Sequence, residues 1–300
     1  MKTQHPGHDH AGRLRRLRQR LATAELPALL VSDPLNRAYL SGFTGSAGYL
    51  LITAEAAYLL TDFRYVEQAT KEAPLYQVIR HQPQVGASLG ELLADQGIRR
   101  MGFEAHHLTY HQYSEFSEQL AGVELVPAGR LVEELRAVKE PSELTLLRTA
   151  VQIADEAFRA LIHRGVIRSG VKESEVAAEL AYELRKRGAE GPAFPIIVAS
   201  GKRSALPHGR AAEKVIAVGD LVTIDFGARY RGYNSDCTRT VVVGKATARQ
   251  REIYDLVLTA QKRALEGLRP GMTGAEADEL AREVIASAGY GEAFGHGLGH

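Results

Sequence analysis

The chain has 300 residues, 45% of them hydrophobic, which is enough for two ordinary domains with sizeable cores. Its 37 Lys and Arg residues against 36 Asp and Glu residues give a formal charge of +1, so net charge favours neither nucleic acid nor an anionic membrane as a partner. The single cysteine, Cys237, excludes an internal disulfide, and no leader resembling a secretion signal precedes the first predicted helix. We therefore expect a globular cytoplasmic protein that acts on a small molecule or a peptide.

Residues 1–12 are predicted to form a polar, disordered tail. This stretch contains three histidines that could instead bind a metal ion, namely His5, His8 and His10. The next segment, "GRLRRLRQRL", carries a leucine every three or four residues, which is the spacing of one helix face. We expect an amphipathic surface helix here, with its arginines solvated.

Short apolar runs then alternate with helical patterns. The runs are "PALLVS", "GYLLIT", "AYLLT", "QVI" and "RMGFE", and the helical patterns cover residues 65–72, 88–95 and 111–120. This alternation predicts an α/β domain over residues 13–135. A charged segment containing Pro141 follows and leads into a long helical pattern, which places the domain boundary near residue 135.

Two polar segments of this domain are candidate functional sites. The segment "NRAYLSGFTGSAG" is predicted to be a loop and, as a second possibility, a contact surface. Its candidate residues are Asn36, Tyr39 and Phe43. The segment "EAHHLTYHQY" contributes His106, His107 and His111. With no carboxylate run beside them, we expect these histidines at a helix start and not around a metal.

The second half of the chain partly repeats itself. "RSGVKESEVAAELAYEL" from Arg168 and "RPGMTGAEADELAREVI" from Arg269 share Gly, Glu-x-Ala and Glu-Leu-Ala with a one-residue slip. Each copy follows a long helical pattern and leads through glycines to a strand-like run. A repeat of about 100 residues is too long for a solenoid. It indicates two related halves with a site between them.

Two strand-like runs in "GDLVTIDFGARYRGYNSDCTRTVVVG" predict a hairpin. A turn centred between Tyr230 and Arg231 would set Asp225 directly opposite Asp236 on one face. Such carboxylates repel, so a cation, a shared proton or an arginine should lie between them. The alternative is one Asp in a turn and the other in a salt bridge with a nearby arginine. Cys237 would face the other way and is not proposed as a ligand.

The chain ends in "AFGHGLGH", where glycines at alternate positions disfavour a helix. An extended strand would place His296 and His300 on one side. Together with Asp225 and Asp236, a histidine here completes a ligand set suited to manganese, cobalt, zinc or iron. His208 in "SALPHG" is either a surface residue or, near a metal, a donor to an oxyanion or to the substrate.

"SALPHG", "VTIDFGARYRGYNSDCTRT" and "FGHGLGH", in this order, resemble the pita-bread metallopeptidases, which include methionine aminopeptidase, aminopeptidase P, prolidase and creatinase. "NRAYLSGFTGSAGYLLIT" and "LLTDFRY" resemble the accessory domain of the proline-specific members. The resemblance implies an accessory α/β domain over residues 13–135. Over residues 136–300 it implies an α+β pita-bread catalytic domain with pseudo-two-fold halves, incomplete at residue 300.

By this resemblance, Asp225, Asp236 and His300 match metal ligands, while His208 and His296 match histidines that bind the substrate and assist catalysis. The ligands imply two divalent ions, with Mn(II) preferred and Co(II) or Zn(II) as alternatives. The family pattern also requires two glutamate ligands beyond residue 300. We therefore expect either a piece of a longer protein or a degenerate relative, and favour the piece because every ligand expected before residue 300 is present.

The implied function is metal-dependent hydrolysis of Xaa-Pro bonds by a hydroxide that bridges two ions. The preferred assignment is an Xaa-Pro dipeptidase that takes a peptide with proline at the second position. The resemblance further implies a cytoplasmic homodimer without a nucleic-acid or membrane partner. The alternatives are an Xaa-Pro aminopeptidase, a metal-free creatinase-like enzyme and a non-catalytic peptide-binding module, and the 300 residues alone need not be active.

Overall fold

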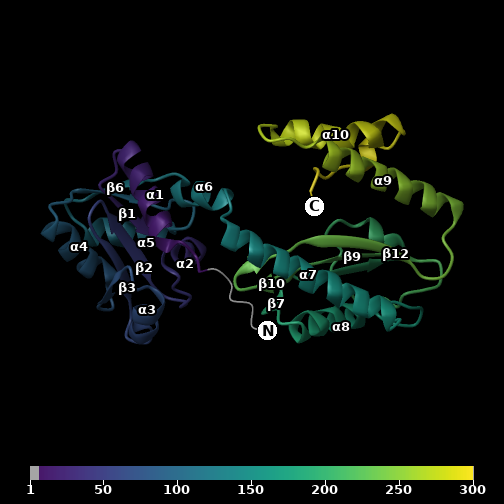
Figure 1. Cartoon of the computed structure of the whole chain (residues 1–300), viewed down its shortest axis with the longest axis horizontal. Coiled ribbons are helices and arrows are strands. Elements are labelled where there is room, and N and C mark those ends of the chain that lie inside the picture. Colours follow the sequence, from purple (N-terminus) through teal and green to yellow (C-terminus); the bar gives the residue numbers. More distant parts are fainter. Residues whose placement is uncertain (1–6, 300) are drawn as a thin grey trace. The chain divides into compact units, whose positions relative to one another are not determined.

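A computed structural model describes residues 7–299 of the chain, which divides into two compact units, Met1–Ser142 and Glu143–His300 (Figure 1). The division falls somewhat after the boundary that the sequence predicts near residue 135. Of the tail histidines, His5 lies outside the described residues. Within residues 7–299, every helix is too short or too polar to span a lipid bilayer.

The first unit is built on a six-stranded sheet with the strand order β4-β3-β2-β1-β5-β6. β1 lies at the centre, antiparallel to β2 and parallel to β5, and all four of its residues are buried. The strands are β1 (Ala28–Val31), β2 (Tyr49–Thr53), β3 (Ala57–Thr61), β4 (Gln77–Arg80), β5 (Arg100–Phe103) and β6 (Glu124–Pro127). Five of them coincide with the apolar runs of the sequence.

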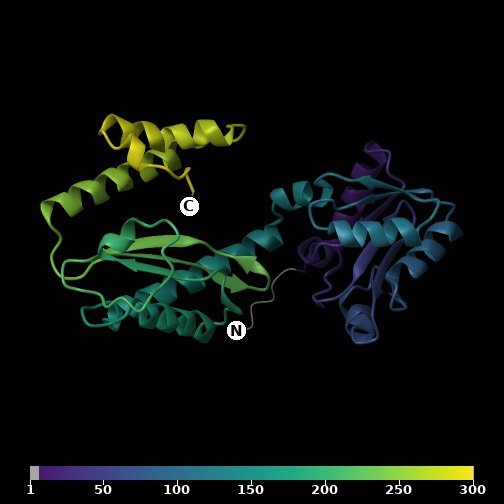
Figure 2. The same ribbon diagram turned by 180° about the vertical axis from the view of Figure 1, so that it is seen from behind.

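Helices pack on both faces of this sheet, as expected for an α/β domain (Figures 1 and 2). One apolar cluster joins one face of the sheet to α1, α2, α3 and α6, and a second joins the other face to α4 and α5. The helices are α1 (His10–Thr23), α2 (Pro34–Ser41), α3 (Val66–Glu72), α4 (Val85–Asp95), α5 (Tyr110–Gln119) and α6 (Leu131–Ala137). The predicted α/β class is therefore confirmed.

The loop predicted over "NRAYLSGFTGSAG" is wrong in its first half. Asn36 and Tyr39 lie in α2, because Asp33 caps the helix and Pro34 occupies its first turn. The helix ends at Gly42, whose φ of 83° is left-handed, and Phe43 follows in the core.

The leucine face of α1 packs into the core as predicted, but the expectation of solvated arginines is wrong for Arg13. This side chain is 1% exposed, and its guanidinium pairs with Glu140 at 2.8 Å and donates to the Tyr39 carbonyl at 2.8 Å. A buried cation requires such partners. Arg15, two residues later, is exposed.

The start of α1 also differs from the tail expected over residues 1–12. The helix begins at His10, since the Asp9 carboxylate accepts a hydrogen bond from the Gly12 amide. His10 Nδ1 lies 3.1 Å from the Tyr39 carbonyl, and His8 Nδ1 lies 3.2 Å from Ser142 Oγ. These two histidines thus contact other parts of the first unit.

The second unit begins with two long helices, α7 (Pro141–His163) and α8 (Glu173–Lys186). They cover one face of a sheet with the order β12-β9-β8, and a smaller sheet with the order β11-β10-β7 continues the hairpin (Figures 1 and 2). The strands are β7 (Gly191–Pro192), β8 (Ile197–Ser200), β9 (Leu221–Phe226), β10 (Ala228–Tyr230), β11 (Tyr233–Asn234) and β12 (Cys237–Val242). The central strand β9 buries alternate residues against the helices and turns the others, including Asp225, to the opposite face.

The sequence repeat corresponds to two helix pairs. α9 (Ala248–Gly267) and α10 (Gly274–Ser287) form the second pair and share a small apolar cluster of their own. In both pairs a glutamate in the first turn of the second helix accepts a hydrogen bond from the N-cap amide: Glu175 from Lys172 in α8 and Glu276 from Thr273 in α10. In α10 the Thr273 hydroxyl also accepts from the Glu276 amide, which completes a capping box. A short 3₁₀ turn (Gly291–Ala293) follows α10.

Candidate functional site

The hairpin formed by β9 to β12 differs in register from the prediction. Asp225 pairs with Thr238, and Tyr230 pairs with Tyr233, so the expectation that Asp225 directly opposes Asp236 is wrong. The turn is centred between Arg231 and Gly232, which both have positive φ values, of 47° and 78°. Two-residue hairpin turns of this kind match the strand twist and favour glycine at the second position.

Both aspartates nevertheless belong to one face of the hairpin. Thr238 Oγ1 donates to Asp225 Oδ1 at 2.9 Å, so these two side chains meet across the strands. Asp236 stands two residues before Thr238 and is therefore a diagonal neighbour of Asp225 on that face. Cys237 faces the other way and packs against the apolar core, and this burial raises the pKa of its thiol.

A glycine keeps the middle of the hairpin narrow. A side chain at Gly227 would overlap the backbone carbonyl of Ser235, so only glycine fits between β9 and β10. The Ser235 hydroxyl accepts a hydrogen bond from the Ala228 amide at 2.9 Å and donates one to the Ala150 carbonyl in α7 at 3.1 Å. These contacts fix the backbone next to Asp236.

Strand pairing across β8 connects the hairpin to the loop that carries His208. Ile197 in β8 pairs with Asp225 on one side and forms an isolated antiparallel bridge with Arg210 on the other. Directly paired residues point to one face of a sheet, and so do residues two apart along a strand. His208 lies in the turn that directly precedes Arg210.

The structure brings His208 and His296 together although 88 positions separate them in the sequence. Their ring centroids lie 6.1 Å apart with an interplanar angle of 70°, and both side chains are exposed. His296 Nδ1 lies 3.0 Å from the Gly297 carbonyl, so this nitrogen must carry a proton to donate there. The other ring nitrogen, Nε2, is then the one available to a substrate.

The predicted strand around His296 is wrong for the described residues 294–299, which have no strand partner. Side chains of α10 bind this backbone instead. Arg282 Nη2 donates to the His296 carbonyl at 3.0 Å, and Asp278 Oδ1 accepts from the Leu298 amide at 2.5 Å. His300, the predicted metal ligand of this segment, lies outside the described residues.

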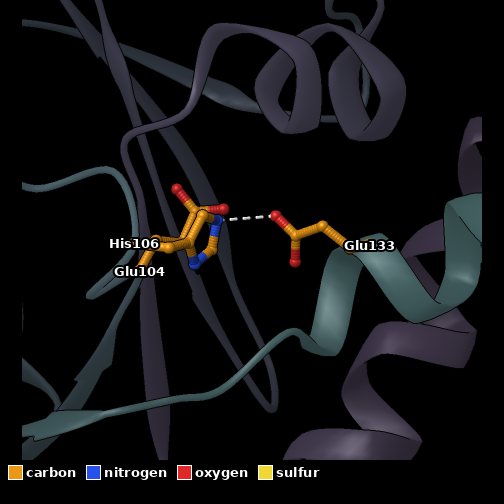
Figure 3. Close-up of side chains that lie close together, drawn as sticks. All are labelled: Glu104, His106 and Glu133. Carbon is orange, nitrogen blue, oxygen red and sulfur yellow. Dashed lines mark ion pairs between the residues drawn. The ribbon is translucent and has the colours of Figure 1, made fainter. Parts of the chain in front are cut away.

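The first unit contains a cluster that the sequence did not predict (Figure 3). Glu104, His106 and Glu133 place one potential ligand atom each within 4.8 Å of one another, the one such group among residues 7–299. His106 Nε2 points at Glu133 Oε1 over 2.7 Å. The carboxylate that meets His106 is not a sequence neighbour, since Glu133 comes from α6, 27 positions further along. His106 and His107 lie in the turn before α5 and His111 in its first turn, close to the predicted helix start.

Hydrogen-bond donors already satisfy the carboxylates of this cluster. Glu104 is 3% exposed, and its Oε2 accepts from the amides of Ser32 and Asp33 at 2.7 and 2.6 Å. The Asn36 amide nitrogen donates to Glu104 Oε1 at 2.7 Å and to Glu133 Oε1 at 2.6 Å. Because this NH₂ group lies between the two carboxylates, the cluster holds the β1–α2 turn, and a cation would have to displace Asn36.

Comparisons with known proteins agree with the two-part architecture. The profile of Metallopeptidase family M24 matches residues 145–300, and that of the Creatinase/Prolidase N-terminal domain matches residues 13–138. A solved Xaa-Pro dipeptidase from Bacillus anthracis is 46% identical, with a TM-score of 0.94 over 97% of this chain and 81% of that one.

Two further similarities come from other organisms. The Xaa-Pro dipeptidase of Pyrococcus horikoshii is 41% identical over 92% of this chain and 76% of its own length. The crystal structure of an X-Pro aminopeptidase from Thermotoga maritima is 37% identical, with a TM-score of 0.84 over 93% of this chain and 78% of that one. The pita-bread fold expected for the second unit is thereby confirmed.

Proposed function

Because the chain belongs to metallopeptidase family M24 and carries a Creatinase/Prolidase N-terminal domain, we propose that it hydrolyses the peptide bond before proline as an Xaa-Pro dipeptidase. Two similar proteins with that name are 41% and 46% identical to it and match more than nine tenths of its length. The proposed substrate is a dipeptide with proline at its second position.

One structural observation carries the proposal. In the second unit, Asp225 and Asp236 belong to one hairpin, Asp225 lies on the sheet face opposite the apolar core with α7 and α8, and the rings of His208 and His296 lie 6.1 Å apart. Carboxylates and imidazoles are the groups that metal-assisted amide hydrolysis needs.

The donor set of this face suits divalent metal ions. Asp225 and Asp236 offer hard oxygen ligands, and the hydroxyl of Thr238 orients Asp225 in the way that outer-shell partners orient metal ligands. We assign these aspartates and His300 as ligands of two divalent ions, with manganese preferred over cobalt or zinc. Ions bound there would polarise the scissile carbonyl and lower the pKa of water.

His208 and His296 are assigned to the substrate. Two ring N–H groups from opposite sides can converge on one amide and stabilise the negative charge that develops on its oxygen. With Nδ1 of His296 donating to the Gly297 carbonyl, Nε2 accepts from a substrate N–H when unprotonated and donates when protonated. The pair therefore positions the amide for attack.

A second candidate function is an Xaa-Pro aminopeptidase that cleaves the same bond in longer peptides. It is favoured by the similarity to the enzyme from Thermotoga maritima, whose name states that activity. The family resemblance also implies a cytoplasmic homodimer, which light scattering of the purified protein and cell fractionation would test.

The deciding experiment measures proline release from Ala-Pro and hydrolysis of Ala-Pro-Ala, with Mn²⁺ and with EDTA, and uses Pro-Ala as the reversed control. A dipeptidase releases proline from Ala-Pro in the presence of Mn²⁺ and leaves the tripeptide intact, whereas an aminopeptidase cleaves both. Asp225→Asn should reduce turnover by at least about 100-fold, and Asp255→Asn, an exposed aspartate of α9, should not. A chain that binds these peptides, does not bind manganese and does not hydrolyse the peptides would be a binding module.

A further inference from the structure

Glu173, the first residue of α8, is a fully buried carboxylate with four hydrogen-bond donors. Its Oε1 accepts from the amide and the hydroxyl of Ser200, both at 2.8 Å. Its Oε2 accepts from Arg203 Nε at 3.1 Å and from the Ala212 amide at 3.2 Å. A buried charge is tolerated only with such compensation, so these four bonds depend on one another.

Three of the four donors come from the two ends of one segment, which we call the loop of residues 201–212: Ser200 ends β8, and Ala212 lies twelve residues later. The fourth donor, Arg203, lies in the 3₁₀ turn Gly201–Ala205 with which this loop begins. His208 lies near the tip of this loop and is exposed. A loop held at both ends has fewer conformations to lose when a residue at its tip must take one position.

A short chain of contacts runs from Glu173 to His208. Arg203, which donates Nε to Glu173, also donates Nη2 to the Arg210 carbonyl at 2.7 Å. The Arg210 amide in turn donates to the His208 carbonyl at 2.9 Å. The Glu173 carboxylate therefore holds Arg203 in place, and Arg203 holds the backbone at Arg210, just after His208.

A lysine holds the near end of the loop through the same network. Lys214 Nζ donates to Ser200 Oγ at 2.6 Å and pairs with Asp220 at 2.8 Å. Burial opposes ionisation of Asp220, but the bonds from Lys214 and from the Ala217 amide lower the pKa of its carboxyl. The ion pair thus stays charged at neutral pH and keeps the Ser200 hydroxyl directed at Glu173.

We propose that Glu173 is a positioning residue that sets His208 for the substrate by closing the loop of residues 201–212. This inference rests on the proposed function, in which His208 contacts the scissile amide. A displacement of about 1 Å in a group that contacts the reacting atoms can cost 100-fold in rate. Glu173 itself does not contact the substrate and acts through Arg203 and the loop backbone.

The test compares Glu173→Gln with a matched control, Glu183→Gln. Glu183 is also on α8, is 2% exposed and is also bound by arginines, with Arg164 Nη1 at 2.8 Å. It stands ten residues further along the helix, roughly 15 Å away, and none of its bonds involves the loop. In Glu173→Gln an NH₂ group replaces one of the two carboxylate oxygens. Because this NH₂ group cannot accept the hydrogen bonds that the oxygen accepted, at least one end of the loop is released.

Two readouts separate positioning from general destabilisation. Hydrogen exchange of the amides of residues 201–212 should become at least about 10-fold faster in Glu173→Gln and stay unchanged in Glu183→Gln. Each variant is measured at the same number of degrees below its own unfolding midpoint, so that a general loss of stability does not affect the comparison. With Ala-Pro, Glu173→Gln should lower kcat by about 10- to 100-fold with little change in KM. In a His208→Ala background the same change should cost less than about 3-fold, because the group that it positions is absent.

Equal losses from Glu173→Gln in both backgrounds, or unchanged exchange in the loop, would overturn the proposal. A wild-type chain that releases no proline at any manganese concentration, even when it is extended at its C-terminus by a segment that supplies the two glutamate ligands, would overturn the proposed function instead. In that case the exchange comparison still decides whether Glu173 closes the loop. The two failures are therefore distinguishable.

Discussion

Replacing Arg13 by methionine should destabilise the first unit by about 3 kcal/mol. The Arg13 guanidinium makes two hydrogen bonds to Glu140 and one to the Tyr39 carbonyl. At roughly 1.5 kcal/mol for each charge-assisted bond, the three together contribute about 4.5 kcal/mol. The methionine stays buried and recovers roughly 1.5 kcal/mol by its apolar surface. Arg16 continues to pair with Glu140, so the carboxylate is not left without a cation.

The matched control is Arg15→Met, the same substitution two residues away on the exposed side of α1. It should change stability by less than about 0.5 kcal/mol. The assay is the urea dependence of hydrogen exchange, read by mass spectrometry in peptides from α1 and α2, which follows the first unit separately from the second. A loss below about 1 kcal/mol for Arg13→Met, or equal losses for both variants, would refute the reasoning.

Three further predictions concern pH, the buried cluster and the hairpin. Burial opposes ionisation of Glu140, but its bonds to arginines lower the pKa of its carboxyl. Its contribution to stability is therefore complete above the ordinary glutamate pKa near 4.5 and should be lost as the pH falls below that value, which free energies of unfolding measured from pH 6 to pH 3 would show. Glu104→Gln should lower the free energy of unfolding of the first unit, measured in urea, by about 2 kcal/mol, and Glu118→Gln at an exposed position should lower it by less than about 0.5 kcal/mol. If zinc stabilised the first unit, the assignment of this cluster as a hydrogen-bond network would be contradicted. Gly227→Ala should lower the free energy of unfolding by about 3 kcal/mol or more, because the added methyl group overlaps the Ser235 carbonyl. Gly274→Ala, at the open start of α10, should be nearly neutral, and thermal unfolding of both variants would test this.

The sequence predicted the fold where hydrophobic patterns are local. The runs that became β1, β2, β3 and β5 are apolar over four or more residues and are mostly buried. β6 was missed because this edge strand leaves its end residues exposed and carries Glu124 and Pro127, which weaken the pattern. The burial of Arg13 was missed because its partner Glu140 lies 127 positions away.

The register of the hairpin that carries Asp225 and Asp236 could not be predicted. It was wrong because nothing in the residue pattern showed that Arg231 would adopt a left-handed conformation. The proximity of His208 to His296 follows only from tertiary structure. Glu173 was also missed, since a glutamate at a helix start is common and only its burial marks it.

The bond between Arg13 and Glu140 has a consequence for synthesis of the chain. The leucine face of α1 packs against α6, and its buried arginine waits for residue 140. At about 5–20 residues per second, the intervening 127 residues take roughly 6–25 s to emerge. Arg13 thus leaves the ribosome well before the carboxylate that pairs with it, and the packing of α1 is completed only when the end of the first unit has been synthesised.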